Sequence, residues 1–176
     1  MMKGKFAFTI CTNSYLPQAR ILADSIRQWA PEYTFYVFLA DELDPTVRYE
    51  TFENLTLKPA SELPIDFAAL VKKYGIIELN TCIKASCFKW LFKEFDAGQV
   101  HFFDPDICFF SDIKILDDHF NKASILVTPH ITQPIPWQDG SPTENLFLNH
   151  GLYNLGYLGL KRSTATFAML DWWEEN

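Results

Sequence analysis

Residues 100–110 read VHFFDPDICFF, so two aspartates separated by one proline follow directly on an apolar run. Residues 100–103 have the length and composition of a buried strand. Side chains two positions apart in an extended segment point the same way, so Asp104 and Asp106 are expected to share one face, where their carboxylates suit a divalent cation. Pro105 lacks an amide donor and fits the place where a strand leaves a sheet. The alternative is a proline turn with two solvated carboxylates.

The region that precedes this stretch predicts a β-α-β unit. Residues 6–11 and 34–39 are apolar runs of strand length, and Asp41 closes the second run. Asn13 or Ser14 is placed to cap the intervening helix, whose apolar residues recur close to every 3.6 positions. These recurring residues are Ala19, Leu22, Ala23, Ile26 and Trp29. Such a unit opens a parallel sheet, which binds ligands at the carboxyl ends of its strands.

The rest of the pattern alternates between strands and helices, which predicts an α/β fold with a mostly parallel sheet flanked by helices. Further strands are expected at residues 52–57, 100–103, 125–127 and 152–160, and helices at residues 66–74, 81–95, 115–120 and 164–176. In the helix at residues 81–95, Lys84 shares the apolar face of Phe88 and Leu91. Residues 128–149 contain four prolines and are expected to form a long loop.

The last expected helix has no cap, because the sequence ends within it at Asn176. Phe167, Leu170 and Trp173 form an apolar stripe along this helix. We expect the stripe to be an exposed apolar patch, which a homo-oligomer would cover.

Composition and charge limit the classes of function. The chain has 176 residues, of which 48% are hydrophobic, so it can bury a core of its own and is expected to form one domain, 1–176. Its formal net charge is −7 and its basic residues form no cluster, which argues against nucleic acid as a partner. A phosphate-bearing ligand would need a cation between its own charge and the carboxylates of the protein.

Targeting signals and several common motifs are absent from the sequence. No run of about 18 apolar residues predicts a transmembrane segment, and the apolar stretch near the N-terminus is too short for a signal peptide, so a cytoplasmic location is expected. The cysteines form no C-x-x-C pair and are expected to be reduced and structural. They are Cys11, Cys82, Cys87 and Cys108. The histidines show no zinc spacing, and only His130 and His150, which bracket the long loop, are candidates for further ligands.

Four segments together resemble one family of enzymes. The stretch at residues 100–110 resembles the strand and Asp-x-Asp metal motif of GT-A glycosyltransferases. ELNTCIKASCFKWLF, residues 78–92, resembles the lysine-bearing helix of the family-eight group, which is glycogenin-like or similar to bacterial galactosyltransferases. Residues 153–156, YNLG, are similar to its asparagine–glycine strand, and residues 8–26, FTICTNSYLPQARILADSI, to its nucleotide-binding strand and helix. The four motifs occur in the family's order over nearly all of the chain, which implies the GT-A-type, Rossmann-like fold of nucleotide-diphospho-sugar transferases.

The resemblance implies roles for individual residues. The residues implied for donor or substrate binding are Thr12, Asn13, Asp41, Lys84, Asn154 and Gly156, and those implied for the metal are Asp104 and Asp106. Thr12 and Asn13 would line the nucleoside pocket, and Asp41 would approach the base or ribose. Lys84 would reach the phosphates or the sugar, although its stem could instead run along the helix face toward water. Asn13 could also be only a helix cap.

The activity that follows from the resemblance is that of a metal-dependent hexosyltransferase. Mn²⁺ or Mg²⁺ would bridge the diphosphate of a UDP-hexose, and the sugar would pass to a glycan, lipid or protein acceptor with retention of its anomeric configuration. Asn154 would hydrogen-bond to the sugar or the acceptor. Residues Trp137, Gln138 and Asp139 of the long loop are further candidates for acceptor contact.

Two other interpretations remain beside this one. Relatives carry a third metal ligand, usually a histidine, on a later segment, so the chain is expected to be incomplete at its C-terminus. It could therefore be a nucleotide-sugar-binding module without turnover. An Asp-x-Asp phosphatase is disfavoured, because Cys108 stands where such enzymes carry Thr or Val, and because the motif lies past the middle of the chain.

Overall fold

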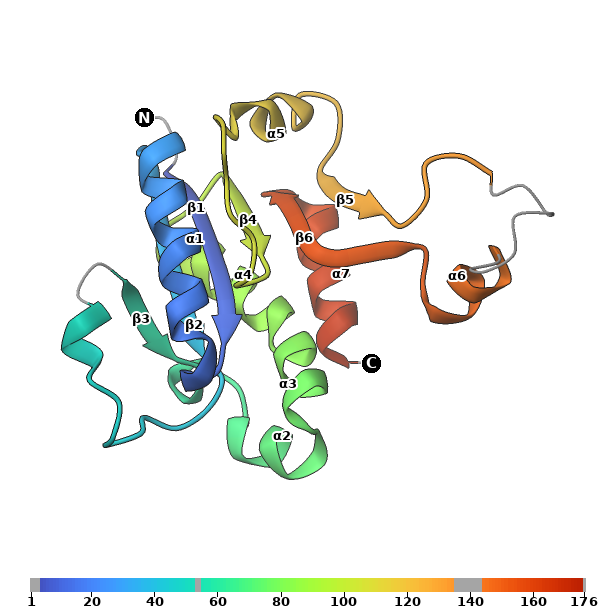
Figure 1. The fold of residues 1–176 in the computed structure, drawn as a ribbon. Coiled ribbons are helices and arrows are strands. Elements are labelled where there is room, and N and C mark those ends of the chain that lie inside the picture. Colours follow the sequence, from blue (N-terminus) through green and yellow to red (C-terminus); the bar gives the residue numbers. More distant parts are fainter. Residues whose placement is uncertain (1–3, 53–54, 135–143, 176) are drawn as a thin grey trace.

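The computed structural model describes residues 4–52, 55–134 and 144–175, and in these residues one mixed sheet runs through the molecule (Figure 1). The strand order is β3-β2-β1-β4-β6-β5. The strands are β1 (Lys5–Cys11), β2 (Tyr33–Leu39), β3 (Thr56–Pro59), β4 (Gln99–Phe103), β5 (Ile125–Pro129) and β6 (Tyr153–Lys161). The pairs β1–β2, β2–β3 and β1–β4 are parallel, and β4–β6 and β5–β6 are antiparallel. The expected mostly parallel α/β sheet is thus confirmed.

Helix α1 (Leu16–Trp29) covers one face of the sheet, as the β-α-β prediction required. A short 3₁₀ turn, η1 (Asn13–Tyr15), leads into it directly from β1. The apolar stripe of α1 packs on the alternate residues of β1 that point to this face, among them Ala7 and Cys11. The buried residues of the stripe are Leu16, Ala19, Leu22, Ala23 and Ile26, whereas Trp29, which was expected to belong to it, is 36% exposed. The helix therefore packs on the sheet from Leu16 to Ile26, and its last turn reaches solvent.

The opposite face holds the aromatic core, under helices α4 (Lys84–Glu94) and α7 (Thr164–Glu175). Phe8 of β1 makes edge or tilted ring contacts with Phe38 of β2, Phe88 of α4 and Phe102 of β4. These four rings are almost completely buried. These ring contacts bind α4 to the sheet.

Helices α2 (Phe67–Lys73) and α3 (Ile76–Cys82) lie at the end of the sheet toward which β1 points (Figure 1). The expected helix at residues 81–95 is divided, because α3 ends and α4 begins on either side of Ile83. Ile83 is buried with ψ near −6°, and its amide still donates to the carbonyl oxygen of Leu79. Helix α4 therefore continues α3 through a local break.

The antiparallel side of the sheet extends away from the body. Helix α5 (Lys114–His119) joins β4 to β5, close to its expected bounds. The first residues of β6, the end of β5 and helix α6 (Glu144–His150) form a projecting arm (Figure 1). Helix α6 occupies part of the expected loop at residues 128–149. Trp137, Gln138 and Asp139 lie outside the described residues.

Two local expectations are wrong. Residues 52–57 were expected to form a strand, but Phe52 ends a 3₁₀ turn, η2 (Tyr49–Phe52), because its ring packs beside α1 and β2, and β3 begins only at Thr56. The stripe of α7 was expected to be exposed, but Leu170 is fully buried against the aromatic core and both its neighbours in the stripe pack there. A shorter 3₁₀ turn, η3 (Ala60–Glu62), follows β3.

Two further expectations concern the state of the cysteines and the absence of a transmembrane helix. All four cysteines are free, Cys11 and Cys87 are buried, and Cys108 is exposed, which differs from the structural role expected for it. None of the helices in the described part of the chain has both the length and the apolar character that a bilayer crossing requires.

Candidate functional site

The carboxyl ends of three parallel strands meet at one edge of the sheet and place three expected residues there. Thr12 follows β1, Asp41 follows β2 after one residue, and Asp104 follows β4. A cavity of about 300 Å³ opens at this edge, and Thr12, Lys84 and Asp104 line it together with residues of α3. Ligands of open α/β sheets bind at such edges, so this cavity is the candidate site.

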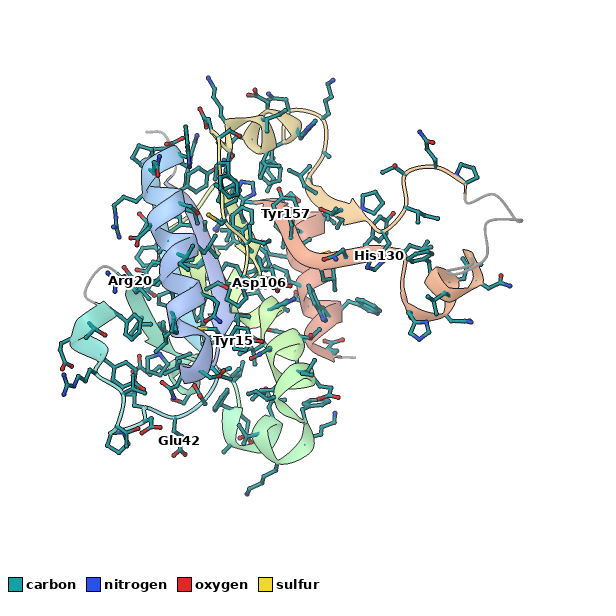
Figure 2. All side chains as sticks on the ribbon, in the orientation of Figure 1. Tyr15, Arg20, Glu42, Asp106, His130 and Tyr157 are labelled. Carbon is teal, nitrogen blue, oxygen red and sulfur yellow. The ribbon has the colours of Figure 1, made fainter. Side chains whose placement is uncertain are left out.

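Asp104 begins a tight turn, which differs from the extended geometry expected for the Asp-Pro-Asp motif. The amide of Ile107 donates to the carbonyl oxygen of Asp104 at 3.1 Å, so Pro105 and Asp106 are the two central residues of a β-turn. The carboxylate of Asp104 is partly exposed at the cavity, and Asp106 is exposed at the tip of the turn (labelled in Figure 2). Burial raises the pKa of Asp104, Lys84 counteracts this rise, and the negative charge of Asp106 adds to it. The charge of Asp106 thus acts on Asp104, although Asp106 is not among the residues that line the cavity.

Lys84 begins α4 and holds a buried ammonium group beside Asp104. Its Nζ donates to the carbonyl oxygen of Leu155 at 3.1 Å, lies 4.2 Å from the centroid of the Phe102 ring, and lies 3.9 Å from Oδ1 of Asp104. The side chain is only 8% exposed, so its stem does not carry the charge out to water. Burial lowers the pKa of Lys84, and Asp104 opposes that shift. The carbonyl oxygen of Leu155 in β6 therefore fixes the direction in which the ammonium group of Lys84 points.

The same strand supplies the wall behind Asp104. The amide of Asp104 donates to the carbonyl oxygen of Gly156 at 2.8 Å, and the amide of Gly156 donates to Oδ1 of Asn154 at 2.7 Å. A Cβ at position 156 would lie 3.0 Å from Oδ2 of Asp104 and 2.8 Å from Oδ1 of Asn154. Gly156 therefore lets this strand approach the carboxylate without displacing the side chain of Asp104 or Asn154.

Asn13 and Asp41 are joined to each other at the neighbouring position. The backbone amide of Asn13 donates to both carboxylate oxygens of Asp41, at 2.9 and 3.1 Å. The side chain of Asn13 donates to the carbonyl oxygen of Glu42 at 2.8 Å and accepts a hydrogen bond from Tyr49. The hydrogen-bonding groups of Asn13 are thus engaged within the protein. Asn13 does not cap a helix, because the N-cap residues of η1 and α1 are Thr12 and Tyr15.

A larger cavity of about 870 Å³ lies beside Asp41, between the end of β2 and helices α2 and α3. Neither Asp104 nor Lys84 lines it. Ile76 of α3 lines both cavities, so they are neighbours along one edge. We place the chemistry in the smaller cavity, because the charged groups that could act on a phosphate converge there.

The sequence pattern missed several residues that line the smaller cavity. Tyr15 and the α3 residues Ile76, Ile77, Asn80 and Thr81 belong to it. Asn80 precedes Lys84 by four positions, the spacing that places side chains on one face of a helix. Extending the helix at residues 81–95 by one turn toward the N-terminus would have revealed it.

The donor set at the turn fits a hard divalent cation. Carboxylate oxygens are the ligands that Mn²⁺ and Mg²⁺ prefer, and a cation would relieve the repulsion between Asp104 and Asp106. No group of three or more His, Cys, Asp or Glu side chains suited to a metal occurs in the described residues. His130 lies on the projecting arm, apart from Asp106 in Figure 2, and His130 and His150 are hydrogen-bonded to nearby carbonyl oxygens.

No protein-family model matches the sequence, and no curated protein matches it. The structure is similar to mouse xyloside xylosyltransferase 1 in its apo form, with a TM-score of 0.55 and 14% identity over 94% of this chain and 71% of that chain. It is also similar to galactosyltransferase LgtC in complex with donor and acceptor sugar analogues, with a TM-score of 0.51 and 12% identity over 97% of this chain and 60% of that chain. Core-mannan synthase A from Aspergillus fumigatus, in a Mn/GDP form, has a TM-score of 0.50 and 10% identity over 98% of this chain and 64% of that chain.

These likenesses show that the fold is of the GT-A glycosyltransferase type. The chain spans less than two thirds of the length of LgtC and of the mannan synthase.

Proposed function

We propose that this chain carries the donor site of a metal-dependent glycosyltransferase, which transfers a sugar from a nucleoside-diphosphate sugar to an acceptor. One observation carries the proposal: the buried ammonium of Lys84 and the carboxylate of Asp104 face the same cavity at the carboxyl edge of a GT-A-type sheet. A phosphate-binding cation beside a metal-binding carboxylate is the arrangement that a nucleoside diphosphate requires.

Each residue of the site has a proposed task. Lys84 binds a diphosphate oxygen, because its ammonium retains donors beyond the one that the carbonyl of Leu155 accepts. Thr12 lines the cavity at the nucleoside end, and Asp41, held by the amide of Asn13, faces the base or ribose. Gly156 keeps the space beside Asp104 open for the ligand.

Asp104 and Asp106 would hold Mn²⁺ or Mg²⁺. The bound ion supplies Lewis-acid stabilisation of the charge that develops on the departing diphosphate. Water and diphosphate oxygens would complete its coordination, because two carboxylates alone are fewer than the six ligands such ions take. The protein's part is to orient the carboxylates through the β-turn and through the hydrogen bond from Asp104 to β6.

The proposed donor is a UDP-hexose, transferred with retention to a glycan, lipid or protein. LgtC was solved with donor and acceptor sugar analogues and the mannan synthase with Mn and GDP, so both uracil and guanine donors belong in a test. Asn154, exposed at the start of β6, is proposed to contact the sugar or the acceptor.

Calorimetry of nucleotide binding tests the proposal. UDP, GDP and their hexose conjugates are titrated into the chain with Mn²⁺ and with EDTA. We expect binding that depends on Mn²⁺ in the parent chain and is lost in Asp104→Asn and Asp106→Asn. Asp118→Asn removes the same charge at an exposed position of α5 and should bind like the parent. Unchanged binding in both motif variants would refute the metal site.

A second measurement separates transfer from binding. Release of nucleoside diphosphate is followed with the same donors, Mn²⁺ and a panel of simple sugars as acceptors. A rate near about 1 s⁻¹ would be that of a typical enzyme. Tight, metal-dependent binding without release would instead favour a nucleotide-sugar-binding module.

A further inference from the structure

The projecting arm (Figure 1) carries an apolar groove that the candidate site does not use. The groove has a volume of about 310 Å³ and is lined by residues 131–134, which follow β5, by α6, and by the turn that leads into β6. Its apolar lining comes from Ile131, Pro134, Phe147, Leu148 and Leu152. Leu148 is 67% exposed and Leu152 is 50% exposed, so both side chains offer apolar surface to a ligand.

The walls of this groove are tied to each other by the protein itself. The amide of His130, just after β5, donates to the carbonyl oxygen of Leu152 at 3.0 Å, and the ring of His130 lies 5.6 Å from that of Phe147. Gly151, with a φ of 108°, ends α6 and turns the chain into β6, a conformation that suits glycine. The groove is therefore a defined feature of the arm.

The size of the groove distinguishes a small molecule from a protein partner. Seven residues line it, whereas a stable protein interface involves about 20–30 residues on each side. Its volume lies at the lower end of the range for small-molecule pockets, about 300–1,000 Å³. The groove therefore fits part of one small molecule, and its lining requires that part to be apolar.

The charge of the arm differs from that of the whole chain. Among Asp, Glu, Lys and Arg, residues 125–134 and 144–155 contain only Glu144, whereas the formal net charge of the chain is −7. An arm without lysine or arginine has no attraction for an anionic membrane surface, which would also repel an acidic protein. The part of the ligand that lies in the groove is thus uncharged, and a bilayer is disfavoured as its source.

One short stretch of chain joins the groove to the candidate site. Leu152 lines the groove, and the carbonyl oxygen of Gly156 accepts a hydrogen bond from the amide of Asp104. Four residues of extended chain span at most about 14 Å. Asn154 lies between these two positions and is exposed. A molecule that fills the groove can therefore extend a polar part past Asn154 toward the proposed donor.

We propose that the groove is an acceptor subsite that binds the alkyl chain of a glycoside whose sugar lies beside Asn154. The proposal rests on the proposed function, because it names the class of acceptor for the same site. An amphiphilic acceptor suits both ends of this stretch: the arm buries the alkyl chain, and the polar edge of the sheet contacts the sugar hydroxyls. A sugar without an alkyl chain leaves the groove in water and binds more weakly.

Calorimetry with two glucosides tests the proposal on the whole chain. Octyl β-D-glucoside, kept below its critical micelle concentration, and methyl β-D-glucoside share one sugar and differ only in the alkyl chain. With saturating Mn²⁺ and UDP present, we expect the octyl glucoside to bind at least about tenfold more tightly, because about two buried methylene groups already give that factor. Equal affinities would overturn the inference, and Mn²⁺-dependent UDP binding would still support the proposed function.

Leu148→Ser is the test variant, and Ile115→Ser is its matched control. Both replace an aliphatic residue of a short helix, and the two residues are 67% and 65% exposed, but Ile115 lies on α5, outside the groove. We expect Leu148→Ser to weaken binding of octyl glucoside about fivefold or more and to change binding of methyl glucoside less than about twofold. Ile115→Ser should leave both within about twofold of the parent.

Leu152→Ser removes apolar surface from the β6 side of the groove and should repeat the loss of octyl glucoside binding. This second variant keeps the test decisive if Leu148→Ser does not fold, which circular dichroism shows. Equal losses in the groove variants and in Ile115→Ser would mean that the octyl chain binds to exposed apolar residues in general. That result would overturn the inference.

Three further outcomes would each overturn the acceptor subsite. Displacement of octyl glucoside by UDP would place its chain in the nucleotide site. A parent dimer that Leu148→Ser converts to monomers in sedimentation would show that a second copy covers the groove. Binding of the parent to phosphatidylcholine vesicles, if Leu148→Ser abolishes it, would show that the arm contacts a bilayer. A parent chain that binds no nucleotide with Mn²⁺ would remove the proposed function, and this inference with it.

Discussion

Gly156 shows how the absence of one side chain controls the space at the candidate site. The hydrogen bond between its carbonyl oxygen and the amide of Asp104 draws β6 toward the end of β4. A methyl group at this position would press on Oδ2 of Asp104 and on Oδ1 of Asn154. The side chain of Asn154 is held by the amide of residue 156 itself, so the carboxylate of Asp104 would have to turn away from the strand.

Gly156→Ala should therefore weaken Mn²⁺-dependent UDP binding by about tenfold or more while the protein stays folded. A carboxylate displaced by a few tenths of an ångström no longer matches the geometry that the ligand needs. Calorimetry gives the affinity and circular dichroism the folded state. Gly75→Ala is the control, because a methyl group there meets only the flexible end of Glu78. Parent-like affinity in Gly156→Ala would argue against the placement of the ligand beside this strand.

Lys84→Met tests the charge of the buried ammonium separately from its stem. Methionine keeps the apolar contact with Phe102 but removes the donor that faces the cavity. We expect UDP binding to weaken by about 1.5–3 kcal/mol, the range for hydrogen bonds to charged groups, and uridine binding to change little. Lys122→Met removes an exposed lysine as the control. If UDP and uridine lose the same affinity, Lys84 supports the structure of the cavity and not the diphosphate.

At the scale of elements, the contact between α4 and α7 is part of the aromatic core and not a free surface. Leu170 is fully buried, and Phe167 packs on Phe92 with ring centroids 5.6 Å apart. Lys89 of α4 forms ion pairs with Asp171 and Glu174 at the rim of this contact. Helix α7 thus closes the face of the sheet that α4 alone leaves incomplete.

Leu170→Ala should consequently lower the free energy of unfolding by about 2–5 kcal/mol, the range for cavity-forming changes in a core. Trp172→Ala, on the same helix, changes a residue that is 63% exposed and should cost much less. Urea denaturation of both variants measures the difference. Equal effects would mean that α7 is only loosely attached to the body in solution.

Much of this arrangement of strands and helices could be predicted from the sequence, because the spacing of apolar residues indicates which positions are buried. The opening β-α-β unit, the strand before Asp104 and the helix that carries Lys84 all have such periodicity. Phe52 was misassigned because an aromatic residue in a short apolar run fits a strand as well as a packed turn. The break at Ile83 carries no Gly or Pro and leaves the helical pattern intact, so the pattern does not reveal it.

The candidate site could be predicted only in part, because some of its residues come together only in the folded chain. Asp104 and Lys84 stand next to strong element signals, so their meeting at the sheet edge could be expected. Asn80 of α3 and Tyr15 of η1 become part of the site because both line one cavity with residues at the end of β4, which are distant from them in sequence. The turn at Asp106 also begins at a long-range contact, the hydrogen bond from the amide of Asp104 to the carbonyl oxygen of Gly156 in β6.

At the scale of the whole molecule, a buried polar network joins both halves of the sheet at the end opposite the candidate site. His101 of β4 is fully buried, with Nε2 3.1 Å from Asp117 and Nδ1 3.1 Å from the hydroxyl of Tyr157. Asp117 of α5 also accepts hydrogen bonds from Lys5 of β1 and Tyr33 of β2. Burial alone would raise the pKa of Asp117, but hydrogen bonds from His101, Lys5 and Tyr33 outweigh it and lower that pKa to about 2.

This network predicts that stability falls as the solution is made acidic. Burial lowers the pKa of His101 in the folded protein, although Asp117 opposes the shift. Below about pH 6.5 the unfolded chain therefore binds a proton that the folded chain does not, so the free energy of unfolding decreases as pH falls. The decrease stops at the folded pKa and has a limiting slope of about 1.4 kcal/mol per pH unit. Asp117 stays ionised throughout this window.

Thermal unfolding between pH 5 and pH 8 checks this prediction. His101→Gln should be less stable than the parent at pH 7, because its packing and hydrogen bonds are poorer, yet its Tm should vary less with pH. The other three histidines are exposed and provide the background in both proteins. A variant profile as steep as the parent profile would show that some other group causes the acid sensitivity.

The pairing of β6 with β4 has a consequence for how such a chain can evolve. Tyr157 pairs with Phe103, and the next position brings Gly156 to the amide of Asp104. A slip of one residue would turn Leu158 and Leu160 out of the core and bring a residue with a side chain to the place of Gly156. Insertions and deletions within the regularly paired residues 157–161 would thus act as folding defects before ligand binding comes under selection. Substitutions, in contrast, can still be selected for ligand binding. The side chains at this end of the sheet can therefore change between descendants while the spacing of the residues along the strand is inherited unchanged.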